Sequence, residues 1–247
     1  SFGVHVHAIA AQYILNHGTE EQKQYFLPKM ASGEMIGAIA MSEPGAGSDL
    51  ASASCRAERD GDEWVLNGQK VWTSGALHST RGMLVARTDI DQPKHKGLTY
   101  FIVDLEQPGV EIRPIKQMNG MAHFNEVFFT DARVPKGNLV GQPGGAFGQT
   151  MRQLEHERGG IDRLVSNKAL YDMAVLQADT SNPLVRQEIA RIEIGYRVGR
   201  ILVIREVLKQ APAGFSAATK CFCTELEARI SDFVFTTLGM QATLWDD

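Results

Sequence analysis

The chain has 247 residues, of which 43% are hydrophobic, enough to bury a core in one large domain or two small ones. A net charge of -4 and a pI near 6.0 argue against nucleic acid as the main partner, and no apolar run is long enough to span a bilayer. The three cysteines are odd in number and match neither a zinc-binding nor a CxxC spacing. This indicates reduced thiols in a cytoplasmic protein without a metal site.

Residues 1–35 have a helical pattern and are interpreted as the end of an N-terminal helical domain. The first helix is expected over 2–17. Thr19 then begins a capping box in which Gln22 takes the reciprocal position. The second helix is expected to run to about Met30, and Gly33 is expected to close it.

Residues 36–140 change to a period of two, which predicts a central antiparallel β-domain of short strands. Asn67-Gly68 is the strongest turn signal and predicts a hairpin. Asn125 and Glu126 are candidate site residues, but alternation favours the outward face of their strand. The expected strands are 36–41, 52–58, 63–67, 69–74, 82–88, 98–105, 109–114 and 124–130.

Residues 141–247 are expected to form a C-terminal helical domain. The glycine-rich stretch 141–148 is not followed by Lys-Ser/Thr, so it is interpreted as a linker rather than a phosphate loop. Helical patterns over 146–178, 183–209 and 216–238, joined by short links, predict a bundle. The predicted fold class is therefore α+β.

The loop 38–49, AIAMSEPGAGSD, follows a predicted strand and is the first candidate ligand site. Its glycines let the backbone turn tightly and approach a flat ligand. Its hydroxyls and backbone N–H groups can bind carbonyl or phosphate oxygens. It matches neither GxGxxG nor a Walker loop, and Pro-Gly and Gly-Ser also occur in ordinary turns.

A second stretch, EWVLNGQKVWTS at 63–74, places a large flat ring and two hydroxyls at the end of the predicted hairpin. MSEPGAGSD followed by NGQKVWTS resembles the acyl-CoA dehydrogenase family, whose signature is a Ser/Thr-Glu-Pro-x-Ala-Gly-Ser-Asp loop and a Trp-x-Thr/Ser strand. The resemblance extends over nearly the whole chain. Family members are longer at both ends, so the sequence is expected to be a truncated form.

The resemblance implies a helical N-terminal segment, a central β-domain and a C-terminal helical bundle. It also implies FAD as cofactor and an acyl-CoA thioester as substrate. The family reaction removes a proton from Cα of the thioester and a hydride from Cβ, and passes electrons to an electron-transfer flavoprotein. By position, the residues expected at the flavin are Met41, Ser42, Gly47, Ser48, Trp72 and Ser74, with Ser48 also at the substrate. The alternative for Trp72 is packing within the hairpin.

The reaction requires a carboxylate base, and Glu157 is the candidate. On a helix it falls between Leu154 and Ile161 on an apolar stripe, where burial would raise its pKa. Some family members carry their glutamate here, directly before an arginine, and Arg158 resembles the family arginine near CoA. Others carry the glutamate near the C-terminus, so the base can also lie beyond this sequence. Glu43, in the flavin loop, is the weaker rival.

The partner-facing half of the family pattern is altered. The Arg-x-x-Phe-Gly motif is missing, and Thr236 stands where a glutamine is typical. The two-subunit, steroid-type enzymes of actinobacteria have this kind of split. Three functions therefore stay open: an acyl-CoA dehydrogenase, a non-catalytic partner subunit of a heteromeric one, or an acyl-CoA oxidase or flavin monooxygenase on the same fold. A homo- or hetero-oligomer is expected in each case.

Overall fold

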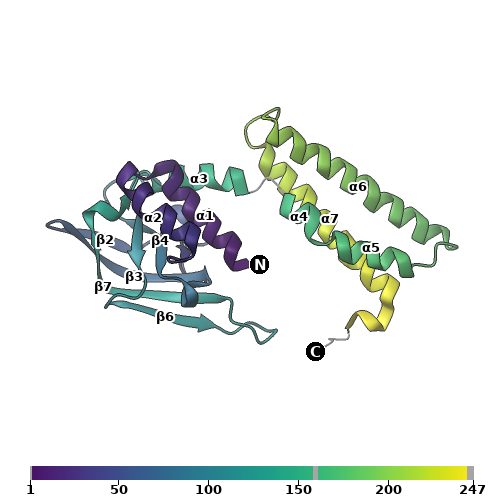
Figure 1. Cartoon of the computed structure of the whole chain (residues 1–247), viewed down its shortest axis with the longest axis horizontal. Coiled ribbons are helices and arrows are strands. Elements are labelled where there is room, and N and C mark those ends of the chain that lie inside the picture. Colours follow the sequence, from purple (N-terminus) through teal and green to yellow (C-terminus); the bar gives the residue numbers. More distant parts are fainter. Residues whose placement is uncertain (1, 158–160, 244–247) are drawn as a thin grey trace. The chain divides into compact units, whose positions relative to one another are not determined.

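The computed structural model describes residues 2–157 and 161–243. The chain divides into two compact units, Ser1–Gln153 and Leu154–Asp247. The first contains two N-terminal helices, a sheet and the beginning of α3 (Ala146–Glu157), and the second contains helices alone, so the fold is α+β as predicted (Figure 1). No helix in the described ranges is long and apolar enough to cross a membrane.

Two helices open the chain, α1 (Phe2–His17) and α2 (Glu20–Ser32). The capping box is present: the Thr19 hydroxyl accepts from the Gln22 N–H, and the Gln22 side chain accepts from the Thr19 N–H. Gly33, with φ 80°, closes α2 as predicted. The buried Gln22 amide also donates to the carbonyls of Gly137 and Leu139, at 2.6 and 2.7 Å. This one side chain therefore starts a helix and ties it to the end of the sheet.

The sheet has eight strands in the order β6-β7-β3-β2-β4-β5-β8, and β1 pairs with β4 outside this path. Most pairs are antiparallel, but β1–β4 and β2–β4 are parallel. The strands are β1 (Gly37–Ala40), β2 (Arg56–Asp60), β3 (Glu63–Ser74), β4 (Arg81–Arg87), β5 (Leu98–Asp104), β6 (Val110–Ile115), β7 (Phe124–Pro135) and β8 (Leu139–Val140). Short 3₁₀ turns at Leu50–Ser52, Ala76–His78 and Lys136–Asn138 join some of them.

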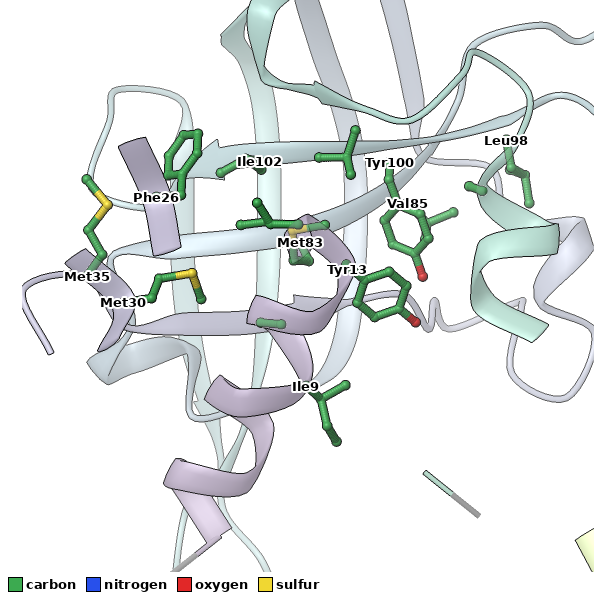
Figure 2. Close-up of a cluster of buried hydrophobic side chains, with 14 of the residues drawn as sticks. Ile9, Tyr13, Phe26, Met30, Met35, Met83, Val85, Leu98, Tyr100 and Ile102 are labelled. Atoms are coloured by element: carbon green, nitrogen blue, oxygen red, sulfur yellow. The ribbon is translucent and has the colours of Figure 1, made fainter. Parts of the chain in front are cut away.

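Both faces of the central strands are buried. On one face, α1 and α2 pack against β4 and β5, and the Tyr13 and Tyr100 rings lie 4.7 Å apart. Figure 2 shows this cluster, with Ile9, Tyr13, Phe26, Met30, Met83, Val85, Tyr100 and Ile102 among its members. On the other face, Trp64 of β3 meets Phe101 of β5 edge-on at 5.4 Å. Because these strands are not neighbours in the sheet, the sheet curls around this second cluster.

The prediction of a hairpin at Asn67-Gly68 is wrong. β3 runs without a break from Glu63 to Ser74, and β7 pairs along its length. A β-bulge of β7 lies opposite the dipeptide instead: at the register shift between Leu66 and Gly68, Thr130 and Asp131 face the single residue Asn67. The Asn67 side chain binds the Asp131 side chain and backbone N–H, both at 3.0 Å. The polar side-chain groups of Asn67, which could have stabilised a turn, thus bind a residue 64 positions further along the chain.

The second unit has α4 (Ile161–Ser166), α5 (Lys168–Gln177), α6 (Pro183–Val207) and α7 (Phe215–Leu238), and it also holds the end of α3 (Ala146–Glu157). The helix predicted over 146–178 is therefore made of shorter pieces. Asn182 caps α6 with Pro183 in its first turn, as the sequence indicates. The core of the unit includes Tyr171, Ile192, Leu226, Ile230 and Phe233. The domain boundaries at residues 35/36 and 140/141 stay a prediction.

We predict that Gly68→Ala destabilises the protein. Gly68 has φ +146°, and an added Cβ would lie 2.7 Å from the Cα of Cys55, a backbone atom that cannot yield. The expected loss is about 1–3 kcal/mol of unfolding free energy, measured by urea denaturation. Gly137→Ala is the control, because a Cβ there meets nothing within 4 Å. Equal stability of the two variants would contradict the prediction.

Candidate functional site

The loop from Met41 to Asp49 lies directly against β3. Within it, Glu43 and Ala46 exchange two backbone hydrogen bonds, at 3.0 and 3.1 Å, which close a tight turn. The N–H of Val71 donates to the carbonyl of Ser42 at 2.9 Å. The structure therefore brings together the two sequence stretches that the motifs single out, the glycine loop and the strand that carries Trp72.

The turn does not use its glycines in the expected way. Neither Gly45 nor Gly47 has a positive φ. A Cβ built at either position meets nothing within 4 Å, so alanine would fit both places in this chain. The turn itself therefore does not require glycine at these positions. The open space beside Gly47 instead leaves room for a molecule outside the chain to approach the backbone.

Trp72 occupies an unusual backbone position at the surface. Its φ is 61°, in a region that bulky side chains rarely adopt. The strain falls at a bulge of β3, where the register with β7 shifts between Lys70 and Thr73. The ring meets Phe124 edge-on at 5.9 Å, yet 57% of the residue is exposed. Packing within a hairpin does not explain it, and backbone strain that presents a large ring to solvent is typical of a ligand site.

Three hydroxyl groups surround this region. Ser42 follows β1, Ser48 lies in the exposed part of the loop, and Ser74 ends β3 two residues after Trp72. Among the described residues, no side-chain hydrogen bond engages any of the three hydroxyls. Each is free to donate to, or accept from, a bound molecule.

Beneath the loop lies a buried ion pair that the sequence patterns do not reveal. The Lys70 ammonium and the Glu43 carboxylate are 2.7 Å apart, with side chains 0% and 4% exposed. The ammonium also donates to the Met41 carbonyl at 2.9 Å. The carboxylate accepts from the Ser54 N–H and hydroxyl and from the Cys55 N–H, at 2.6, 2.8 and 2.9 Å. These contacts indicate that Glu43 orders the loop and argue against its role as the rival catalytic base.

Burial and hydrogen bonding act in opposite directions on Glu43. Burial raises the pKa of its carboxyl group, but the Lys70 charge and the hydrogen bonds from Lys70, Ser54 and Cys55 lower it more. The net pKa lies below the ordinary value of 4.5, so the group is ionised at neutral pH. Next to it, burial raises the pKa of the Cys55 thiol to about 11, which keeps this cysteine protonated and unreactive.

Met41 is held from the opposite side by Tyr100. The buried Tyr100 hydroxyl lies 3.1 Å from the Met41 sulfur and 2.7 Å from the Thr150 hydroxyl. Burial raises the pKa of Tyr100 well above 10, so it stays a neutral donor. Sequence reasoning missed Lys70 and Tyr100, because each looks like an ordinary strand residue and acts only through contacts made in the fold.

The predicted orientation of Asn125 is also wrong. Alternation placed it on the outward face, but it is 1% exposed and donates to the Thr73 carbonyl at 3.0 Å. The alternation of β7 itself accounts for this, because Asn125 lies on the same face of the strand as the buried Val127 and Phe129. Glu126 is half-buried and accepts from the Gln69 amide.

Glu157 does not have the predicted environment. It ends α3 in the second unit, and its side chain is exposed rather than buried. Met151, on the same apolar stripe, is also 41% exposed. The stripe predicts burial only where another element covers it, and the described residues leave these positions uncovered. Arg158 lies outside the described residues.

We predict that Glu43→Gln lowers the unfolding free energy by about 3–5 kcal/mol at pH 7, because it leaves the Lys70 charge buried without a counterion. The folded-state pKa of Glu43 is depressed, so its stabilisation is complete above about pH 4.5 and is lost as pH falls further. The difference between wild type and variant should therefore narrow in acid. Urea denaturation at several pH values measures it.

Glu58→Gln is the control for this measurement, since Glu58 is an exposed carboxylate on β2. It should change the free energy by less than about 0.5 kcal/mol at each pH. A Glu43→Gln effect of the same size would show that the buried pair adds nothing to stability.

Comparison with known proteins identifies the family of the chain. The sequence models described as acyl-CoA dehydrogenase N-terminal and middle domains match residues 1–34 and 38–132, together more than half of the chain. The chain is 44% identical over 195 residues to "Acyl-CoA dehydrogenase IpdE1" of Mycobacterium tuberculosis (strain ATCC 25618 / H37Rv). The match covers 76% of this chain and 50% of that protein.

Two solved structures have the same fold. One is titled "Tcur3481-Tcur3483 steroid ACAD", with 32% identity and a TM-score of 0.88 over 99% of this chain and 66% of that one. The other is the ChsE4-ChsE5 complex from Mycobacterium tuberculosis, with 31% identity and a TM-score of 0.81 over 95% and 64%. The chain thus spans between about half and two thirds of the length of these three relatives. It belongs to the acyl-CoA dehydrogenase family.

Proposed function

We propose that this protein is an FAD-dependent acyl-CoA dehydrogenase that introduces an α,β double bond into an acyl-CoA thioester. The observation that carries the proposal is the strained, exposed Trp72, which a backbone hydrogen bond of the preceding residue joins to the loop of Ser42 and Gly47. Family membership supports it, since the matched middle domain, residues 38–132, contains this loop and strand.

The residues present fit FAD. The exposed face of Trp72 offers a flat surface for stacking, and the Ser42 and Ser74 hydroxyls offer donors to ring heteroatoms. Gly47 and Ser48 lie where the backbone is open, and we assign them to the phosphates, with Ser48 also contacting substrate. Met41, held by Lys70 and Tyr100, supports the loop at its start. FAD, when bound, supplies the acceptor for the hydride from Cβ.

The reaction also requires a base for the proton at Cα. We propose Glu157 for this role and Arg158 for attraction of the CoA moiety, on the basis of their match to family positions. A base of this kind needs a dry surrounding that raises its pKa. The proposal therefore requires that Glu157 becomes covered in the assembled protein, because it is exposed in this chain.

A second candidate is a non-catalytic subunit that completes the FAD site of a partner chain. The exposed Glu157 and the altered motif at Thr236 favour it. The similarity to a chain of the ChsE4-ChsE5 complex supports a heteromeric assembly. An electron-transfer flavoprotein is the proposed acceptor of the dehydrogenase, whereas reaction with oxygen would indicate an oxidase or monooxygenase.

We predict that the full-length protein binds FAD and that Gly47→Ala weakens binding about tenfold or more, because the added methyl group occupies the space of the cofactor. Flavin fluorescence titration measures the Kd. Gly137→Ala is the control, since both alanines fit the fold. A wild-type protein that stays colourless with added FAD would refute the flavin assignment, and an unchanged Kd in Gly47→Ala would remove Gly47 from the site.

We predict that Glu157→Gln lowers kcat by about 10²–10⁴-fold and leaves FAD bound, because a general base contributes on this scale. Bleaching of the flavin by acyl-CoA without oxygen, and turnover with an artificial acceptor, measure this. Glu155→Gln is the matched control two residues earlier, and Glu155 is exposed as well. Unchanged turnover in Glu157→Gln would place the base elsewhere. An active complex that forms only with a second gene product would favour the partner-subunit function.

A further inference from the structure

Lys70 is a feature of this region that neither stability nor the proposed chemistry explains. Its side chain is 0% exposed, and its ammonium has two oxygen partners, the Glu43 carboxylate at 2.7 Å and the Met41 carbonyl at 2.9 Å. Burying a charge is costly even when it is paired, and apolar residues of similar volume often stabilise a core as well or better. A buried lysine here calls for a reason other than packing.

The partners of Lys70 suggest that reason. Met41 and Glu43 flank Ser42, and Glu43 in turn holds Ser54 and Cys55 of the segment before β2. The ammonium thus ties three parts of the chain together: the start of the loop, the approach to β2, and β3 itself. Geometry of this kind fixes an arrangement rather than adding general stability.

The β3 bulge completes the same connection. Between Lys70 and Thr73 the pairing with β7 shifts, and the Val71 N–H binds the Ser42 carbonyl at 2.9 Å. Trp72, at φ 61°, follows immediately. Lys70 from its side chain and Val71 from its backbone therefore fasten Met41–Glu43 to the strand just before the strained indole.

We propose that Lys70 and Glu43 are positioning residues for the flavin: their buried pair sets the position of residues 41–43 relative to Trp72, so that one network places both sides of the flavin ring. This inference rests on the proposed function. It assigns to Lys70 a role in cofactor geometry and no contact with substrate or with the reacting atoms.

Lys70→Met in the full-length protein tests the proposal. It keeps the approximate length of the side chain and removes the donor to Met41. We expect FAD to bind about tenfold or more weakly, and the circular dichroism of the visible flavin bands at saturating FAD to fall, because the ring is held less uniformly. Lys94→Met is the matched control: it breaks the Lys94–Asp49 ion pair of the same loop, which has a similar 2.6 Å separation but is exposed.

A second variant separates positioning from stability. Lys70→Met leaves the Glu43 charge buried alone, which lowers stability whether or not the pair positions the flavin. Lys70→Met combined with Glu43→Gln removes both charges. The new side-chain amide oxygen at position 43 can still accept from Ser54, whereas the Cys55 N–H loses its acceptor because it binds the other oxygen of the carboxylate. We expect the double variant to recover much of the lost thermal stability, yet to keep the weakened FAD binding and the reduced flavin signal.

The outcomes are distinguishable. If wild type binds FAD and Lys70→Met or the double variant matches Lys94→Met in Kd and in the flavin signal, the positioning role is refuted and the proposed function stands. If FAD affinity recovers in the double variant together with stability, the pair acts on stability alone and the proposal is also refuted. If wild type binds no FAD, both the proposed function and this inference fail.

Discussion

A single buried interaction organises the candidate site: the Lys70 ammonium between the Glu43 carboxylate and the Met41 carbonyl. Charged groups that are buried away from water need partners of opposite charge at close range, because the free-energy cost of an unpaired buried charge is far larger than that of a buried pair. Every donor and acceptor that this pair uses belongs to the loop, to the approach to β2, or to β3. The loop can therefore shift only if a buried charge loses its partner. The short, exposed turn is thus held in one conformation, as core residues are.

The elements that sequence predicts well are those whose signals are local. The Thr19–Gln22 capping box and the Gly33 closure depend on a few neighbouring residues, and both form as expected. Asn67-Gly68 is equally local and equally strong, but it fails. Its backbone packs against Cys55 and its side chain binds Asp131, so contacts far along the chain keep the strand straight where the dipeptide alone favours a turn.

The same difference between local and long-range signals applies to the candidate site. Motifs locate the loop and Trp72, which the fold brings together through Val71. The bulge and the positive φ of Trp72 cannot be predicted from alternation, because a bulge is itself a break in alternation. The charge beneath the loop depends on contacts made in the fold. Glu157 marks a different limit. A helical stripe indicates which residues would be buried together, but only a covering element buries them, and this chain leaves Glu157 exposed.

The contacts of the Gln22 side chain, at the start of α2, affect the order in which parts of the protein fold during synthesis. Its amide binds the carbonyls of Gly137 and Leu139, 115 and 117 residues further on. A growing chain leaving the ribosome has its first two helices long before those carbonyls exist. The helices cannot obtain their final anchor until the last strand of the sheet emerges, and non-local contacts of this kind form late. During synthesis, the apolar faces of α1 and α2 therefore stay uncovered until the sheet has formed. In this period they are accessible to a chaperone.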